Sequence, residues 1–125
     1  MAIIVQKYGG TSIGTVDKIS QVADKIIAEK NNNNDIVVVV SAMGGETNRL
    51  LDLAKKINPE VNGRELDVLI STGEQVTISL LALTLIEKGY DAISLTGAQA
   101  GIVTNTMFNK ARIESINNSI IKNYL

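Results

Sequence analysis

The sequence predicts an α/β fold with a mostly parallel sheet. Three short apolar segments with strand character, residues 3–5, 36–40 and 92–95, alternate with longer segments whose apolar residues recur at helical spacing. The second of them is β-branched at every position, which is typical of a strand covered on both faces. Glycine-rich loops follow the first two segments, at the carboxyl ends of strands, where sheets of this class bind ligands.

Composition excludes several classes of protein. The chain has 125 residues, enough for one domain, and its 45% hydrophobic content and net charge of −1 argue against disorder and against a basic nucleic-acid surface. Cys and His are absent, which excludes disulfides, zinc-thiolate sites and His-dependent nucleophilic catalysis. Any chemistry here therefore uses Lys, Arg, carboxylates, hydroxyls, backbone amides and bound ions.

The sequence also gives no sign of a targeting or membrane segment. Gln6 and Lys7 interrupt the first apolar stretch, so it does not form a secretory signal. No uninterrupted apolar stretch reaches the roughly 18 to 20 residues that a membrane span needs. We expect a cytoplasmic protein without a membrane or nucleic-acid partner.

Local signals set the elements of the first half. Thr15 is predicted to cap a helix that runs to about Glu29, and the four asparagines 31–34 predict a turn before the second strand. Thr47 is predicted to cap a second helix. Asn58-Pro59 is predicted to end it.

A third helical region begins near Gly63. It is predicted to break at Thr72-Gly73-Glu74-Gln75, because this tetrad has the pattern of a capping box and can restart a helix. The restarted helix, from Glu74 to Lys88, is apolar around most of its circumference, so we expect it to be buried. Gly89 is predicted to end it.

The last third of the chain predicts a strand, a loop and a helix. Residues 92–95 are predicted to form the third strand, and the small residues of 96–104 indicate close packing more than a ligand-lining loop. The isoleucines within 111–125 recur at helical spacing, which predicts a terminal helix.

Two loops are the first candidates for a binding site. The segment Lys7-Tyr8-Gly9-Gly10-Thr11-Ser12 combines small residues, hydroxyls and a positive charge, although it is neither a Walker A loop nor a dinucleotide fingerprint. Taken alone, it is better interpreted as a tight turn with a surface lysine. The segment from Ser41 to Thr47 repeats the arrangement after the second strand. On neighbouring strands, the two loops predict a concave, amide-lined site for a phosphate or a carboxylate.

Glu74 admits two interpretations that the pattern does not separate. In the first, it is a favourable acidic residue in the first turn of a restarted helix. In the second, it is a ligand contact that accepts hydrogen bonds from an ammonium or hydroxyl group.

Several segments together resemble the aspartokinase family, and the resemblance covers nearly the whole chain. The matching segments are Lys7–Ser12, Val38–Gly44, Arg64–Asp67, Ser71–Val76, Thr96–Ile102 and Lys110–Ile113. This resemblance implies the amino-acid kinase fold, a three-layer α/β/α sandwich with a mostly parallel sheet. Two positions depart from a common family pattern, because Asn105 stands where Asp is frequent and Phe108 where His is frequent.

The resemblance also implies an activity. Aspartokinases transfer the γ-phosphoryl group of ATP to the side-chain carboxylate of L-aspartate, giving 4-phospho-L-aspartate, the first step towards lysine, threonine and methionine. The implied cofactors are ATP and Mg²⁺ held through the nucleotide phosphates, with no metal ligand from the protein. Lys7 would be the catalytic residue that stabilises the transferring phosphoryl group. The implied phosphate-binding residues are Lys7, Tyr8, Gly9, Gly10, Thr11 and Ser12, and the implied aspartate-binding residues are Ser41, Thr47 and Glu74.

We further expect residues 1–125 to be the amino-terminal part of such a catalytic domain, without the remainder of that domain and without the ACT regulatory domains. The chain alone is then expected to be inactive, with the remainder of the kinase chain and further copies of itself as partners. Two alternatives stay open. In the first, the chain is a non-catalytic fragment or subunit that acts by association. In the second, it is another member of the amino-acid kinase fold, with glutamate, acetylglutamate or uridylate as substrate.

Overall fold

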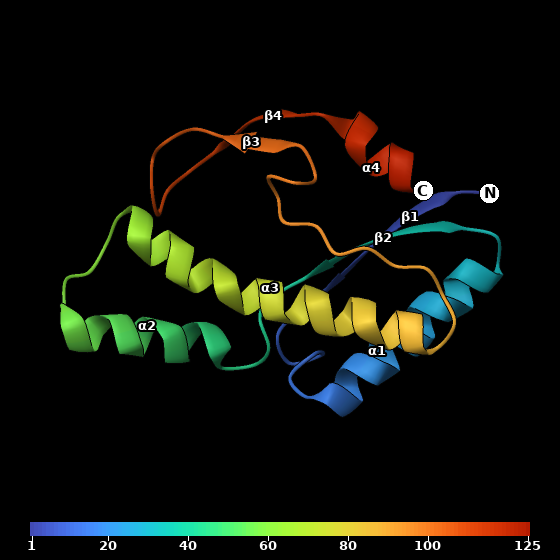
Figure 1. Ribbon diagram of the computed structural model, residues 1–125, viewed down its shortest axis with the longest axis horizontal. Helices are drawn as coiled ribbons and strands as arrows, with labels where there is room; N and C mark the ends of the chain where they lie inside the picture. The colour runs from blue at the N-terminus through green and yellow to red at the C-terminus, as the bar shows by residue number, and fades with distance from the viewer.

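The computed structural model describes residues 1–125 and confirms the α/β class (Figure 1). Its elements in chain order are β1 (Ile3–Tyr8), α1 (Val16–Asn31), β2 (Asp35–Val40), α2 (Glu46–Ile57), α3 (Arg64–Glu87), β3 (Ile102–Thr104), β4 (Ile113–Ile116) and α4 (Asn118–Tyr124). β1 and β2 pair in parallel, and β3 and β4 form a separate antiparallel pair. The β3–β4 pair rises on the other side of α3 from α1 (Figure 1).

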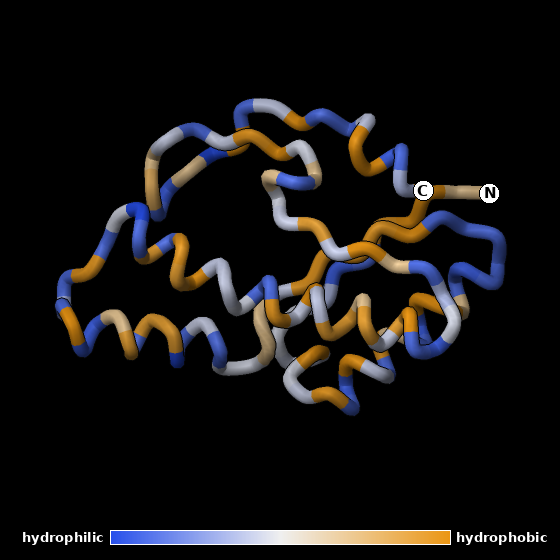
Figure 2. The backbone as a smooth tube through the Cα atoms, in the orientation of Figure 1, coloured by the Kyte–Doolittle hydropathy of each residue, from blue (hydrophilic) through white to orange (hydrophobic).

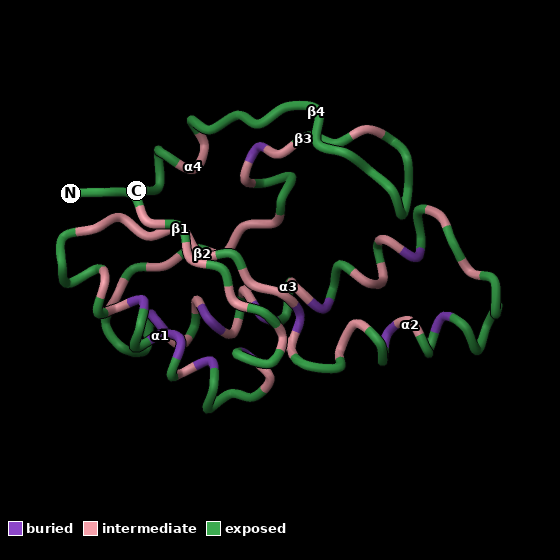
Figure 3. Tube along the Cα trace, turned by 180° about the vertical axis from the view of Figure 1, so that it is seen from behind, coloured by how far each residue is buried: buried purple, intermediate pink, exposed green.

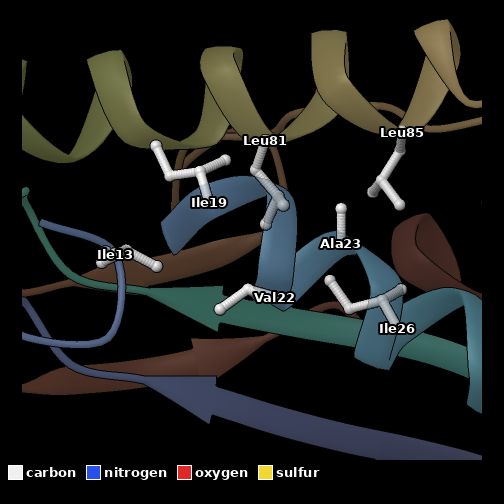
Figure 4. Packing of buried hydrophobic residues seen from close by; sticks show 7 residues of the cluster. All are labelled: Ile13, Ile19, Val22, Ala23, Ile26, Leu81 and Leu85. Carbon is white, nitrogen blue, oxygen red and sulfur yellow. The ribbon is translucent and has the colours of Figure 1, made fainter. Parts of the chain in front are cut away.

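The core lies between α1, α3 and the β1–β2 sheet (Figure 4). It is an aliphatic cluster of Ile13, Ile19, Val22, Ala23, Ile26, Leu81 and Leu85. Tyr8, Val38 and Val40 pack against this cluster from the sheet. Burial of these side chains is the main force that holds α1 and α3 on the sheet, at about 25 cal/mol for each Å² of apolar surface removed from water.

Only one face of the β1–β2 sheet is covered by this core. On the other face, Ile3, Val5 and Val39 are between 47% and 65% exposed. Figure 2 shows apolar stretches in both strands, which correspond to Ile3–Val5 of β1 and Ile36–Val40 of β2. The expectation that the second strand is covered on both faces is therefore wrong for this chain, although its composition is that of such a strand.

The local signals around α1 are confirmed. Thr15 is the N-cap and accepts a hydrogen bond from the Lys18 amide at 3.2 Å. The helix continues to Asn31, and Asn33 turns the chain with a φ of 61°, a left-handed conformation that Asn tolerates better than most residues. The predicted cap at Thr47 is wrong, because the N-cap of α2 is Gly45 and Thr47 is the second residue of the helix.

α3 is one continuous helix, so the predicted break at Thr72 is wrong. The Thr72 hydroxyl donates to the carbonyl of Leu69 at 2.6 Å instead of capping a new helix. The Gln75 side chain donates to the Ser71 hydroxyl rather than reaching back to Thr72. A threonine in a helix interior can satisfy its hydroxyl on the preceding turn, and so the capping-box pattern does not force a restart.

The second half of α3 is less buried than its composition predicts. Thr77, Leu81 and Leu85 are buried, whereas Leu83 and Ile86 on the opposite side are more than half exposed. By length and apolar composition, α3 is the one helix here that would suffice to cross a membrane. It packs against α1 and α2 along one side, as the core helix of a globular domain does.

Two further predictions are corrected near the C-terminus. Residues 92–95 form no strand, because none of their backbone groups is hydrogen-bonded to β2, and Ala92 alone packs against the core. Only one of these four residues is β-branched, so their strand propensity is weak. The predicted helix over 111–125 is divided, since residues 113–116 pair with β3 and only Asn118–Tyr124 is helical. A spacing of three between isoleucines fits a helix, but cross-strand pairing with β3 decides the structure.

Candidate functional site

The first glycine loop is anchored in the core by Ile13, which is fully buried. The Ser12 amide donates to the Gly9 carbonyl at 3.0 Å and closes a tight turn ahead of α1. Gly9 is open on all sides, since a Cβ built there meets nothing within 4 Å. Ile13 therefore fixes the loop to the core, while the backbone at Gly9 is exposed to solvent.

The two glycine loops pack directly against each other. A Cβ on Gly10 would lie 3.1 Å from the carbonyl oxygen of Ala42, and one on Gly44 would lie 3.3 Å from the carbonyl oxygen of Gly10. A Cβ on Gly14 would approach the Gly10 carbonyl to 3.2 Å. A side chain at Gly10 or Gly44 would crowd the opposite loop, and one at Gly14 would crowd its own loop at Gly10, so these glycines allow the close approach of the backbones.

α3 closes the same junction from the other side through Gly73. A Cβ at this buried position would lie 3.0 Å from the Ala42 Cβ and 3.6 Å from the Cγ of Glu46. A glycine inside a helix is unfavourable by about 1 kcal/mol against alanine, and here it allows the helix to touch the second loop. The loop–helix contact therefore places Glu74, the next residue, close to the end of β2.

The converging loops border an open cavity of about 130 Å³. It is lined by Gly10, Ser41, Ala42, Met43, Gly44, Gly45, Thr47 and Asn48. The structure thus brings together three residues predicted for the site, one from the first loop and the two hydroxyl residues of the second. It confirms that the two loops lie on neighbouring strands, because Tyr8 and Val40 are paired in the parallel register.

The cavity includes the N-terminus of α2. The N-cap, Gly45, has no side chain with which to accept a hydrogen bond, and it adopts a φ of 78° that glycine favours. The Glu46 amide donates to Met43 and the Arg49 amide to Gly45, but the amides of Thr47 and Asn48 have no acceptor within the protein. Amides of this kind at the positive end of a helix favour an anionic ligand.

A side-chain pair borders the same helix terminus. Arg49 donates two hydrogen bonds to the Glu46 carboxylate, at 3.0 and 2.6 Å. The hydrogen bond from Arg49 lowers the pKa of Glu46 below its usual value, so this carboxylate stays ionised at neutral pH. The Arg49 guanidinium thus pairs with the acidic side chain in the first turn of α2.

Other predicted site residues lie outside the cavity lining. Lys7 is exposed on the uncovered face of the sheet, opposite Val39 in β2. The Tyr8 phenol points to the helix-covered side, where it donates to Gln6 at 3.0 Å, and burial raises its pKa. The carbonyl of Thr11 accepts a hydrogen bond from the Lys18 ammonium. Glu74 is partly buried beside the cavity and is not part of its lining.

Sequence reasoning did not single out Gly14, Gly73 or Asn48 as parts of this junction. A glycine inside a helical pattern often marks a close approach of backbones, and this signal could have identified Gly73. Asn48 lies directly after Thr47 in the first turn of α2, where side chains and amides surround the same helix terminus. Gly14 had no local signal, because its neighbour Gly44 comes from a different strand end.

Comparisons with known proteins identify the family to which the chain is similar. Residues 2–125 match the model of the amino acid kinase family. The chain is 54% identical over its full length to aspartokinase 2 of Bacillus subtilis and 58% identical to the aspartokinase of Bacillus sp. strain MGA3. It covers 31% and 30% of those two proteins, so it spans less than a third of their length. The crystal structure of aspartate kinase from Synechocystis superposes with a TM-score of 0.77 at 57% identity, over 81% of this chain and 17% of that one.

Proposed function

The chain belongs to the amino acid kinase family, and on this premise we propose that it forms the amino-terminal part of a domain that phosphorylates the side-chain carboxylate of L-aspartate with ATP. The observation that carries the proposal is the combination of two features. Proteins named aspartokinases match the chain over its whole length, and two of the segments quoted in the resemblance, Lys7–Ser12 and Val38–Gly44, contribute residues to the lining of the amide-lined cavity. The product would be 4-phospho-L-aspartate.

The cavity supplies what a carboxylate ligand requires. In the proposal, the Ser41 and Thr47 hydroxyls and the free amides of α2 bind the carboxylates of aspartate, and Glu74 accepts hydrogen bonds from its ammonium group. The nucleophilic carboxylate is already ionised at neutral pH, so the reaction needs no general base. Positioning and charge neutralisation then carry most of the catalysis, which a chain without His or Cys can provide.

The first loop is the proposed binding site of the transferred phosphate. Its open Gly9 and the exposed Lys7 offer a backbone approach and a positive charge on the same strand end. Lys7 would stabilise the negative charge that moves with the phosphoryl group. Tyr8, Gly10, Thr11 and Ser12 would contribute through their backbone and, for the last two, their hydroxyls.

Mg²⁺ would reach such a site with the nucleotide. Mg²⁺ binds phosphate oxygens readily and needs few ligands from the protein in such a site. When bound, it neutralises phosphate charge. The residues of this chain contribute amides and hydroxyls to the phosphates rather than ligands to the metal.

The proposal also covers the layers of the complete fold, the cellular location and the oligomeric state. The uncovered face of β1 and β2 is apolar enough for a further helix layer, which would complete a three-layer α/β/α sandwich in a longer kinase domain. We place the protein in the cytoplasm, as a homo-oligomer whose substrates are L-aspartate and ATP.

The test is ADP release that depends on L-aspartate in the presence of Mg-ATP. We expect activity in a protein that includes this chain and the further kinase segments of its relatives, and none in residues 1–125 alone. Lys7→Ala should lower turnover far more than aspartate affinity, whereas Glu74→Ala should mainly weaken aspartate binding. Activity with glutamate, acetylglutamate or UMP instead of aspartate would overturn the proposed substrate, and no activity with any acceptor would favour a non-catalytic role.

A further inference from the structure

Residues 102–125, which comprise β3, β4 and α4, form an arm that is attached to the rest of the chain at few points. β3 and β4 contact each other, and neither they nor α4 packs against α1, α2 or the β1–β2 sheet. Figure 3 shows the arm exposed along most of its length. Apart from the linker that leads into it, hydrogen bonds from one residue, Asn109, connect the arm to the body.

Asn109 makes this connection through both polar atoms of its side chain and through its backbone amide. Its side-chain oxygen accepts from the Gly63 amide at 2.6 Å, and its side-chain nitrogen donates to the Gly63 carbonyl and to the Asp67 carboxylate. Its backbone amide donates to the second carboxylate oxygen of Asp67 at 2.9 Å. Four hydrogen bonds, two of them to a charged acceptor, therefore join the hairpin tip to the first turn of α3.

The backbone at Asn109 is adapted to this role. Its φ is 64°, so the residue is one of only two non-glycine residues of the chain with a left-handed conformation. This conformation is unfavourable for most side chains, and Asn tolerates it better than most. Asn105 closes the hairpin beneath it, since its side-chain oxygen accepts from the amides of Met107 and Arg112.

The attachment point fixes the arm on a particular side of α3. Asp67 and Glu74 are seven residues apart, about two helical turns or about 10 Å along the axis, and so lie on the same side of the helix. Figure 1 shows the tip of the hairpin close to the start of that helix. The attachment point of the arm therefore lies on the same side of α3 as Glu74, two helical turns before it.

We propose that Asn109 and Asp67 form a latch that holds residues 102–125 in place beside α3, and that release of this pair frees the arm while the body stays folded. Both are positioning residues. The importance of the latch for substrate binding rests on the proposed function, because Asp67 lies on the same side of α3 as Glu74, two turns away. The latch itself stands on the geometry alone.

Limited digestion of the 125-residue chain with trypsin tests the latch directly. Lys110 and Arg112 follow Asn109 in an exposed loop, so cleavage there reports whether the arm is free. Asn109→Gly keeps a residue that favours positive φ and removes the side-chain hydrogen bonds. We expect about tenfold faster cleavage at these two sites, which corresponds to about 1.4 kcal/mol, and an unchanged rate at Lys55 and Lys56 in α2.

Asn33→Gly is the matched control. Asn33 is the other non-glycine residue with positive φ, and its side chain makes no hydrogen bond. This variant should be cleaved at Lys110 and Arg112 at the wild-type rate. Equal rates for wild type and Asn109→Gly would overturn the latch.

A charge exchange separates a specific pair from a general structural effect. Asn109→Asp places a second carboxylate against Asp67 and should open the arm by like-charge repulsion. Combining it with Asp67→Asn restores one donor and one carboxylate, so the double variant should return towards the wild-type cleavage rate. A double variant that is cleaved as fast as Asn109→Asp would contradict direct pairing of the two residues.

The link to the substrate site has its own readout, L-aspartate affinity measured by calorimetry. We expect Asn109→Gly to weaken binding several-fold and Asn33→Gly to leave it unchanged. Unchanged affinity in Asn109→Gly would overturn the link to Glu74. A wild-type chain that fails to bind L-aspartate would count against aspartate binding by this chain, while the trypsin result would still decide the latch.

Discussion

The junction of the two glycine loops and the C-terminal arm are held to the molecule by opposite means. At the junction, Gly10, Gly44 and Gly73 bring three backbone segments together at van der Waals distance. In the arm, a single residue, Asn109, makes the hydrogen bonds that reach the body, through its side chain and its backbone amide. Close packing of backbones tolerates little displacement, whereas a single polar pair can open and close. The predicted binding cavity lies at the closely packed junction, and β3, β4 and α4 pack against neither α2 nor the β1–β2 sheet.

The largest expected effect lies in the core that supports the junction. Leu81→Ala should destabilise the chain by about 2 to 5 kcal/mol, because Leu81 is 5% exposed and its loss leaves a cavity between α3 and α1. Leu83→Ala on the same helix is the control, since Leu83 is 62% exposed and its truncation should cost much less. Urea unfolding measures both. Equal losses would show that this core does not support the body.

The next effect concerns the contact of α3 with the second loop. Gly73→Val should destabilise by about 1 to 3 kcal/mol through overpacking against Ala42, and should also weaken ligand binding in the cavity. Gln75→Val introduces the same β-branched residue at an exposed position of the same helix and should have little effect on either. Thermal unfolding with and without L-aspartate compares them. A Gly73→Val chain as stable as the control would contradict the close approach.

A smaller effect is expected for the arm, and it sharpens the contrast between the two regions. Ile113→Ala removes an apolar side chain that is 60% exposed, so the free energy of global unfolding should change by less than about 0.5 kcal/mol. Urea unfolding followed by circular dichroism measures this change. A loss as large as that of Leu81→Ala would mean that the arm belongs to the cooperative core.

The smallest effect is a dependence on alkaline pH at Tyr8. Burial, with a smaller contribution from the charge of Glu29, raises the pKa of Tyr8 above its ordinary value of 10.0. Above that pH the unfolded chain releases a proton that the folded chain keeps, and so the free energy of unfolding falls as pH rises towards the folded pKa. Tyr8→Phe should remove this part of the alkaline decrease. Denaturant unfolding at neutral and alkaline pH measures the difference, and identical pH profiles would contradict the shift.

The sequence predicted the region whose structure depends on local signals. The cap at Thr15, the turn at 31–34 and the ends of α2 and α3 all follow from residues within one turn of the feature. The convergence of the two loops followed from the parallel order of two neighbouring strands. In each case, local preference and tertiary packing favour the same structure.

The failures occurred where a distant partner decides the structure. The Thr72–Gln75 tetrad has two satisfactory hydrogen-bonding arrangements, and packing of Gly73 against Ala42 favours the continuous helix. β4 is a strand because β3 pairs with it, although its isoleucine spacing suits a helix. The Asn109–Asp67 pair joins residues 42 positions apart, and no local sequence pattern predicts it.

The central claim is that the second loop and the start of α2 bind the carboxylates of aspartate. Titration of the isotope-labelled chain with L-aspartate, followed through its backbone amide resonances, tests it most directly. The account predicts saturable shifts concentrated at the amides of Gly44, Gly45, Thr47 and Asn48, with smaller shifts from D-aspartate at the same concentration. Shifts that appear elsewhere, or that are equal for the two enantiomers, would contradict it.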